Sequence, residues 1–218
     1  MPKKYVVAAL LAALAAAGGG CLWAPRPDPP TGAIHGRVLA RGAQAPESEP
    51  REVVVYLEPL GALSVAAGEG QTATLRQADD DSWPLLAVAA GDRVRFQPHE
   101  PIHHRFFSRS EANAFELRHG EAAQLRHRGV VRFYCSLHPW ESGLIFVTPS
   151  PWFTTSRAAH HYEIRDVPEG RYRLRTWSQA PQEPEQIVVV KPGESTAVDV
   201  ELGASERRSS LPVTLTAD

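Results

Sequence analysis

Short β-branched runs separated by turn residues constrain the fold of this chain more than any other feature. Helical periodicity is almost absent, whereas 16 glycines and 19 prolines punctuate the 218 residues. Apolar or alternating runs bounded by turns such as Ala90-Gly91-Asp92 and Lys191-Pro192-Gly193 are typical of strands. We expect strands at 34–39, 53–57, 85–88, 93–97, 130–134, 144–147, 161–167, 172–177, 187–190 and 196–202. Many short strands with turns between them predict an all-β sandwich or barrel.

The N-terminus reads as an export signal. Lys3-Lys4 precede an apolar run over 5–17 that is too short to span a bilayer, and small residues lead to Cys21. We therefore expect residues 1–20 to be a signal peptide and the protein to be periplasmic in a bacterium. Two interpretations of Cys21 stay open. It is either the acylated first residue of a lipoprotein, with 21–32 as a Pro-rich tether to the membrane, or a free thiol in a secreted chain.

The remaining chain is long enough for more than one minimal sandwich without demanding two full domains. We expect one sandwich domain over 33–150, a small antiparallel β meander extending it over 151–202, and a polar tail over 203–218. The formal net charge of -2 gives no support for a nucleic-acid partner. The sequence leaves the oligomeric state open.

Two polar segments carry the chemistry. The first, 97–108, contains His103 and His104, and the second, 133–143, contains Cys135 and His138. The strand before Cys135 delivers that thiol to its end, and a tight loop brings His138 back three residues later. A thiolate and an imidazole from one loop, joined by an imidazole from a distant strand, form a trigonal set suited to copper. An unpaired cysteine is otherwise a liability in an oxidising compartment. We therefore favour a metal site over the alternative, a buried cysteine beside a surface histidine.

These segments also resemble a known family. The matching residues are Glu100-Pro101-Ile102-His103-His104-Arg105-Phe106-Phe107-Ser108, Phe115-Glu116-Leu117 and Tyr134-Cys135-Ser136-Leu137-His138-Pro139-Trp140-Glu141. Over roughly 75–150 the chain resembles the cupredoxins, and most of all the exported plastocyanin-like proteins often labelled methylamine-utilisation-like. The resemblance implies a Greek-key β-sandwich with one copper ion, whose equatorial ligands are His104, Cys135 and His138. His103 takes the place of an apolar residue of the family.

The flanking strands carry a second resemblance. The segments 32–38, 53–57 and 166–174 resemble strands of carboxypeptidase-regulatory-like β-sandwiches. In such modules the resemblance implies packing or tethering rather than catalysis.

Two positions depart from the cupredoxin pattern. The family usually carries an axial methionine shortly after the second loop histidine, but Glu141 stands there and Met1 is the only methionine. Either Glu141 coordinates copper axially, which favours Cu(II) and lowers the reduction potential, or it points to solvent and leaves an open or metal-free site. Arg105 replaces an asparagine, and because a guanidinium cannot accept a hydrogen bond, the ligand loop must be held another way.

The function predicted from these residues is electron transfer by a membrane-anchored periplasmic copper protein that is not an enzyme. His138 is the expected electron exit. Eight arginines against four glutamates over 93–132 predict a redox partner with an acidic surface, unless they form only a solvated face. The alternative is a non-redox copper-binding or structural cell-envelope protein with a degenerate site. A cysteine hydrolase using Cys135 and His138 is disfavoured, because no orienting acid or oxyanion loop is evident.

Overall fold

The computed structural model describes residues 30–40, 52–61, 70–99, 103–157, 159–179 and 185–202. Every regular element within these ranges is a β-strand, so the all-β prediction is confirmed. The predicted signal peptide, Cys21, most of the tether and the polar tail lie outside the described residues. The described ranges contain no helix that is both long and apolar enough for a membrane span.

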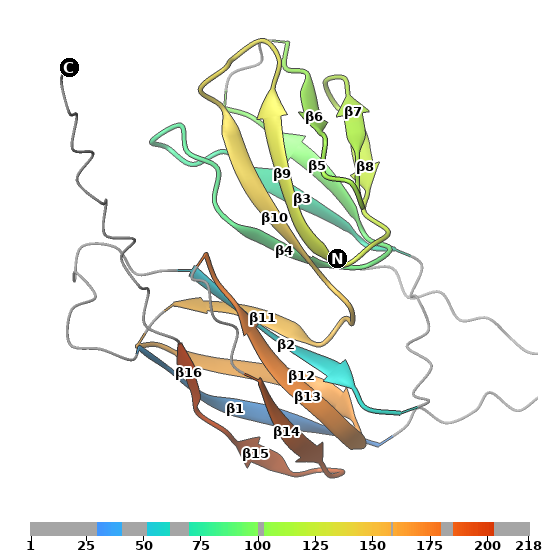
Figure 1. Ribbon diagram of the computed structural model, residues 1–218, viewed down its shortest axis with the longest axis vertical. Helices are drawn as coiled ribbons and strands as arrows, with labels where there is room; N and C mark the ends of the chain where they lie inside the picture. Colours follow the sequence, from blue (N-terminus) through green and yellow to red (C-terminus); the bar gives the residue numbers. More distant parts are fainter. Residues whose placement is uncertain are drawn as a thin grey trace, which may run out of the picture.

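Two sheets form what we call the terminal sandwich, the lower unit in Figure 1. One sheet consists of β1 (Thr31–Ala40), β12 (His161–Pro168), β15 (Ser195–Ala197) and β16 (Val200–Leu202). The other has the order β11 (Phe153–Arg157), β2 (Glu52–Pro59), β13 (Gly170–Trp177) and β14 (Glu185–Val190). β1 pairs antiparallel with β12 and parallel with both β15 and β16. The buried core between the two sheets includes Ile34, Val55 and Tyr172.

Two further sheets form the central sandwich, the upper unit in Figure 1. The larger has the order β4 (Leu86–Ala89), β10 (Ser142–Thr148), β9 (Gly129–Cys135), β6 (Phe106–Ser108) and β7 (Phe115–Leu117). The smaller has the order β3 (Thr72–Arg76), β5 (Arg93–Gln97) and β8 (Ala122–Gln124). In its core, the Trp83 ring lies 5.2 to 5.9 Å from those of Phe96, Phe106 and Phe133, edge-on to each. Aromatic pairs favour this edge-to-face geometry.

The strand partners divide the chain differently from the expected boundaries. Residues 33–59 were grouped with the metal-binding segment, but β1 and β2 pair with strands from the C-terminal part of the chain. The central sandwich is thus inserted between β2 and β11, which are neighbours in one sheet. The expected meander after residue 151 is also divided, because β12 pairs with β1 whereas β13 pairs with β2. A local apolar pattern reveals that a strand is buried, but not which distant strand it joins.

An aromatic junction connects the two sandwiches through β2 and β10, which are both buried on two faces. Alternate residues of β2 enter the terminal core: Val53, Val55 and Leu57. On the opposite face, Tyr56 lies 5.4 Å from Phe146 of β10, and the Phe146 ring stacks on Trp177 at 4.7 Å. A strand buried on both faces requires a continuous apolar run, which explains the sequence of β2. The Arg128–Glu58 ion pair, at 2.6 Å, adds a polar contact between the two units.

We expect Phe146→Ala to lower the free energy of unfolding by about 3–5 kcal/mol, because it removes the ring at the centre of the aromatic junction. Urea denaturation followed by tryptophan fluorescence measures this loss. The matched control is Ile187→Ala, at a strand position that is 61% exposed, where we expect a change within about 0.5 kcal/mol. Equal losses from both variants would contradict a stabilising role for the junction.

Candidate metal centre

Strand pairing brings the two predicted ligand segments together. Cys135 is the last residue of β9, in a strand whose alternate side chains are buried, so its thiol points into the sandwich at its end and is only 3% exposed. Cys135 is paired with Phe106, the first residue of β6. His104 precedes Phe106 by two residues and therefore arrives beside the thiol. The His104 and Phe106 rings stack at 5.5 Å, with only 8° between their planes.

The loop after Cys135 is closed by its own backbone. The Cys135 N–H donates to the Glu141 carbonyl at 3.0 Å, and the Glu141 N–H donates to the His138 carbonyl at 2.9 Å. These bonds return both His138 and Glu141 to the side of the thiol. A glycine is also required at position 143, where β10 pairs with β9, since a Cβ on Gly143 would lie 2.5 Å from Cζ of its partner Phe133.

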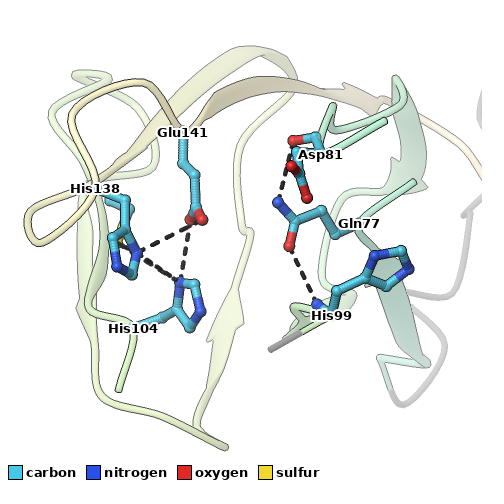
Figure 2. Close-up of polar contacts among 7 residues, drawn as sticks. Gln77, Asp81, His99, His104, His138 and Glu141 are labelled. Carbon is cyan, nitrogen blue, oxygen red and sulfur yellow. Dashed lines mark hydrogen bonds and ion pairs between the residues drawn. The ribbon is translucent and has the colours of Figure 1, made fainter. Parts of the chain in front are cut away.

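Two contacts hold the His104 segment in place. The Ser136 N–H donates to the Arg105 carbonyl at 2.9 Å, so the backbone of Arg105 makes the connection that its guanidinium cannot. Farther back, the buried Gln77 side chain accepts a hydrogen bond from the His99 N–H at 3.1 Å and donates to the Asp81 carbonyl at 3.0 Å (Figure 2). Gln77 thus fixes the backbone at His99, five residues before His104 in the same segment.

Four side chains converge at the end of the central sandwich, and Figure 2 shows His104, His138 and Glu141 pointing toward one another. The two histidine Nδ1 atoms are 3.2 Å apart, and His104 Nδ1 lies 3.1 Å from Glu141 Oε2. Cys135 Sγ lies 3.9 Å from His104 Nδ1 and 3.7 Å from His138 Nδ1. Ligand atoms about 2.0 Å from a tetrahedral centre lie about 3.3 Å from one another. The spacing of the group therefore suits one metal ion.

The burial of these four side chains favours the binding of a cation among them. His104 is 4% exposed and Glu141 is 6% exposed, while the His138 side chain is 18% exposed. Two imidazole Nδ1 atoms, a carboxyl group and a sulfur atom lie within 4.8 Å of one another with little access to water, so they must satisfy one another or share a bound ion. A bound metal ion satisfies all four at once, so the residues present fit a metal. In the described part of the chain, Nε2 of His104 has no hydrogen-bond partner, which leaves that nitrogen to carry the proton when Nδ1 faces the ion.

The structure brings together all four residues singled out in the sequence, and Glu141 points into the cluster rather than to solvent. His103 is exposed beside His104. His99 also lies outside the cluster, with its Nε2 3.4 Å from Asp79. Gln77 was missed, because its contact with His99 spans 22 residues and no motif marks it.

Comparison with known proteins gives a partial structural likeness. No family model matches the chain, and no curated protein matches it. Among solved structures, a purple cupredoxin from Nitrosopumilus maritimus is 21% identical, with a TM-score of 0.29, and the match covers 35% of this chain and 99% of that one. A reduced amicyanin mutant is 20% identical, with a TM-score of 0.30, covering 43% of this chain and 98% of that one. A likeness at these TM-scores carries no functional inference for this chain.

We expect the purified protein to bind one equivalent of Cu(II) and the variants His104→Ala and Cys135→Ser to bind it more than about 100-fold more weakly. Removing a ligand should weaken binding by at least as much as the loss of a group that orients one, about 10- to 100-fold. Isothermal titration calorimetry measures both stoichiometry and affinity. The matched control, His103→Ala, should retain the affinity of the unmodified chain. A loss in His103→Ala, with full affinity retained by His104→Ala, would assign the ligand to His103 instead of His104.

Proposed function

We propose that this chain is a mononuclear copper protein that acts in electron transfer, with the ion held by His104, Cys135, His138 and Glu141. One observation carries the proposal: a buried cysteine sulfur and two imidazole nitrogens converge at the end of a β-sandwich. Thiolate and imidazole donors suit copper, and a trigonal set of one cysteine and two histidines is typical of copper electron-transfer sites. On this proposal the chain is not an enzyme.

The chain's own residues account for the two requirements of an electron carrier. Bound copper would supply a one-electron Cu(II)/Cu(I) couple. The backbone bonds of the 135–141 loop restrain the donors, so their geometry changes little between charge states. His138 is the most exposed of the four, and the Trp140 ring, 75% exposed, lies 5.4 Å from it. Electrons would therefore leave through His138.

Glu141 gives this site its distinctive chemistry. Its carboxylate lies 3.1 Å from His104 Nδ1 and 3.5 Å from His138 Nδ1, which supports a place in the coordination sphere. We propose that it is the axial ligand. A hard anionic oxygen favours Cu(II) over Cu(I), so the reduction potential is lower than with a thioether in that position.

The proposed setting is the periplasm, with Cys21 as the lipid anchor and the terminal sandwich as a packing or tethering module of carboxypeptidase-regulatory-like type. The partner is a redox protein with an acidic surface. Arg105, Arg109 and Arg132 are all exposed in or beside β6 and β9, the strands that carry the ligand segments. Positive charge near the electron exit steers and orients an acidic partner.

The second candidate is a copper-binding or structural cell-envelope protein without a redox role. The buried Glu141 carboxylate favours it, because a ligand that stabilises Cu(II) also suits a site where copper never changes its charge state. A reversible reduction potential distinguishes the two functions.

We expect Glu141→Gln to raise the reduction potential of the copper-loaded protein by more than about 60 mV, a tenfold change in the relative affinity for Cu(I) and Cu(II). The reason is the loss of an anionic oxygen donor. Cyclic voltammetry gives the potential, while absorption and EPR spectra report the change in coordination. The control is Glu116→Gln, which removes an exposed carboxylate paired with Arg105.

Each result has a separate meaning. Identical spectra and potentials for Glu141→Gln and the unmodified protein would exclude Glu141 as a ligand. A thiolate-to-copper absorption band without any reversible couple would favour the non-redox alternative. No copper binding by the unmodified protein would refute electron transfer and any copper-binding role, and would leave only the structural cell-envelope function.

A further inference from the structure

The smaller sheet of the central sandwich presents an exposed cationic surface. Its inward side chains, such as Leu75, Val94 and Phe96, enter the core. The exposed outward residues of its strands are Thr72, Thr74, Arg76, Arg93, Arg95, Gln97 and Gln124, and Arg126 is exposed two residues after β8 ends. We call these residues the arginine face. It holds four arginines and no carboxylate.

The carboxylates nearest this face in the strands' own turns are used elsewhere. Asp92 accepts hydrogen bonds from the backbone N–H groups of Gln71 and Ala89, each at 2.9 Å. Glu121 accepts one from the Arg118 N–H at 2.8 Å. The acidic turn at 79–81 lies beyond the end of β3, where Asp79 contacts His99.

The arginines of this face have no ion-pair partner among the described residues. The ion pairs of arginine in that part of the chain involve Arg105, Arg128, Arg165, Arg173 and Arg175. The Arg126 guanidinium donates from Nη2 to the neutral Gln124, whose Oε1 accepts at 2.7 Å. Strand geometry puts Arg93 and Arg95 about 7 Å apart on the same face. Like charges so close repel, and an anionic surface opposite them removes that repulsion.

The shape and chemistry of the arginine face indicate what that surface is. Protein interfaces are built around buried aromatic or aliphatic anchors. The exposed large hydrophobic residues of the described chain all lie outside this face: Val130, Tyr134, Leu137, Trp140, Ile187 and Val189. The face is the outer side of a sheet, and its hydroxyl and amide groups are hydrogen-bond donors placed between guanidinium groups. That arrangement suits many phosphate oxygens spread over a plane.

We propose that the arginine face binds the anionic phosphate headgroups of a phospholipid membrane. The sequence independently predicts membrane attachment through Cys21, and a basic surface is the usual second attachment signal beside a lipid chain. Each arginine near an anionic bilayer strengthens binding about fivefold. The metal centre lies at the strand ends of the same sandwich, so this docking turns it along the membrane plane and leaves His138 open to a partner. The proposal does not depend on the metal or on electron transfer.

The test is cosedimentation of the protein with lipid vesicles. The protein is purified in its naturally processed form, so that any lipid anchor is retained. One set contains phosphatidylcholine alone, and the other contains phosphatidylcholine mixed with phosphatidylglycerol. Because any lipid anchor acts equally on both sets, the difference between them isolates the headgroup charge. We expect stronger partitioning onto the phosphatidylglycerol vesicles, and we expect high salt to abolish this excess.

The variant Arg93→Gln/Arg95→Gln should reduce the excess partitioning by about 25-fold. The matched control is Arg37→Gln/Arg171→Gln, which removes the same charge from exposed positions of the terminal sandwich and should change the excess less than about twofold. Circular dichroism melting curves establish that the variants fold. If the double variant does not fold, Arg126→Gln alone decides, with an expected loss of about fivefold.

Three results would overturn the proposal. Equal partitioning onto the two vesicle types would remove the role of headgroup charge. Equal losses from the two double variants would show that net charge, not the arginine face, drives binding. Retention on immobilised poly-glutamate that the Arg93→Gln/Arg95→Gln variant loses, with unchanged vesicle binding, would assign the face to an acidic protein.

Discussion

The double burial of β2 and β10 is the constraint on which the rest of the molecule depends. Each strand supplies one face to the core of its own sandwich and the other to the junction, where Tyr56, Phe146 and Trp177 meet. The four sheets therefore stack around three apolar layers. Hydrophobic burial is the main stabilising term in folding. A strand that packs against two cores therefore resists local opening more than an edge strand does.

That rigidity reaches the metal centre through backbone pairing. β10 is paired with β9 along its length, and β9 ends at Cys135. β6 is paired with the last residues of β9, which brings His104, two residues before β6, beside Cys135. His138 and Glu141 lie in the loop that follows β9, and the amides of Cys135 and Glu141 close that loop. The donors are thus positioned by the strand ladder of the central sandwich.

Local sequence patterns predicted the strands well and their partners poorly. The run 53–57 is β-branched and continuous, so it predicts a buried strand. The C-x-x-H pattern after a strand indicated Cys135 and His138 as ligands. Short edge strands such as β7 and β8 were missed, since three residues give too little periodicity to detect. The insertion of the central sandwich could not be predicted, because β2 and β11 meet across more than ninety residues and nothing local marks a long-range pair. Gln77 was missed for the same reason, whereas the inward orientation of Glu141 required its burial to be known.

Sheet membership separates arginines that a charge count along the sequence treats as one group. The arginine excess over 93–132 is one feature in the sequence, yet Arg93 and Arg95 belong to β5 while Arg132 belongs to β9, in the opposite sheet. In two facing sheets, the side chains that point away from the core lie on opposite sides of the sandwich. The excess therefore forms two separate positive surfaces, with the exposed Trp140 and the metal centre at the strand ends between them. A chain with this layout can meet an anionic surface on one side and leave the other side, together with His138, open to an acidic partner.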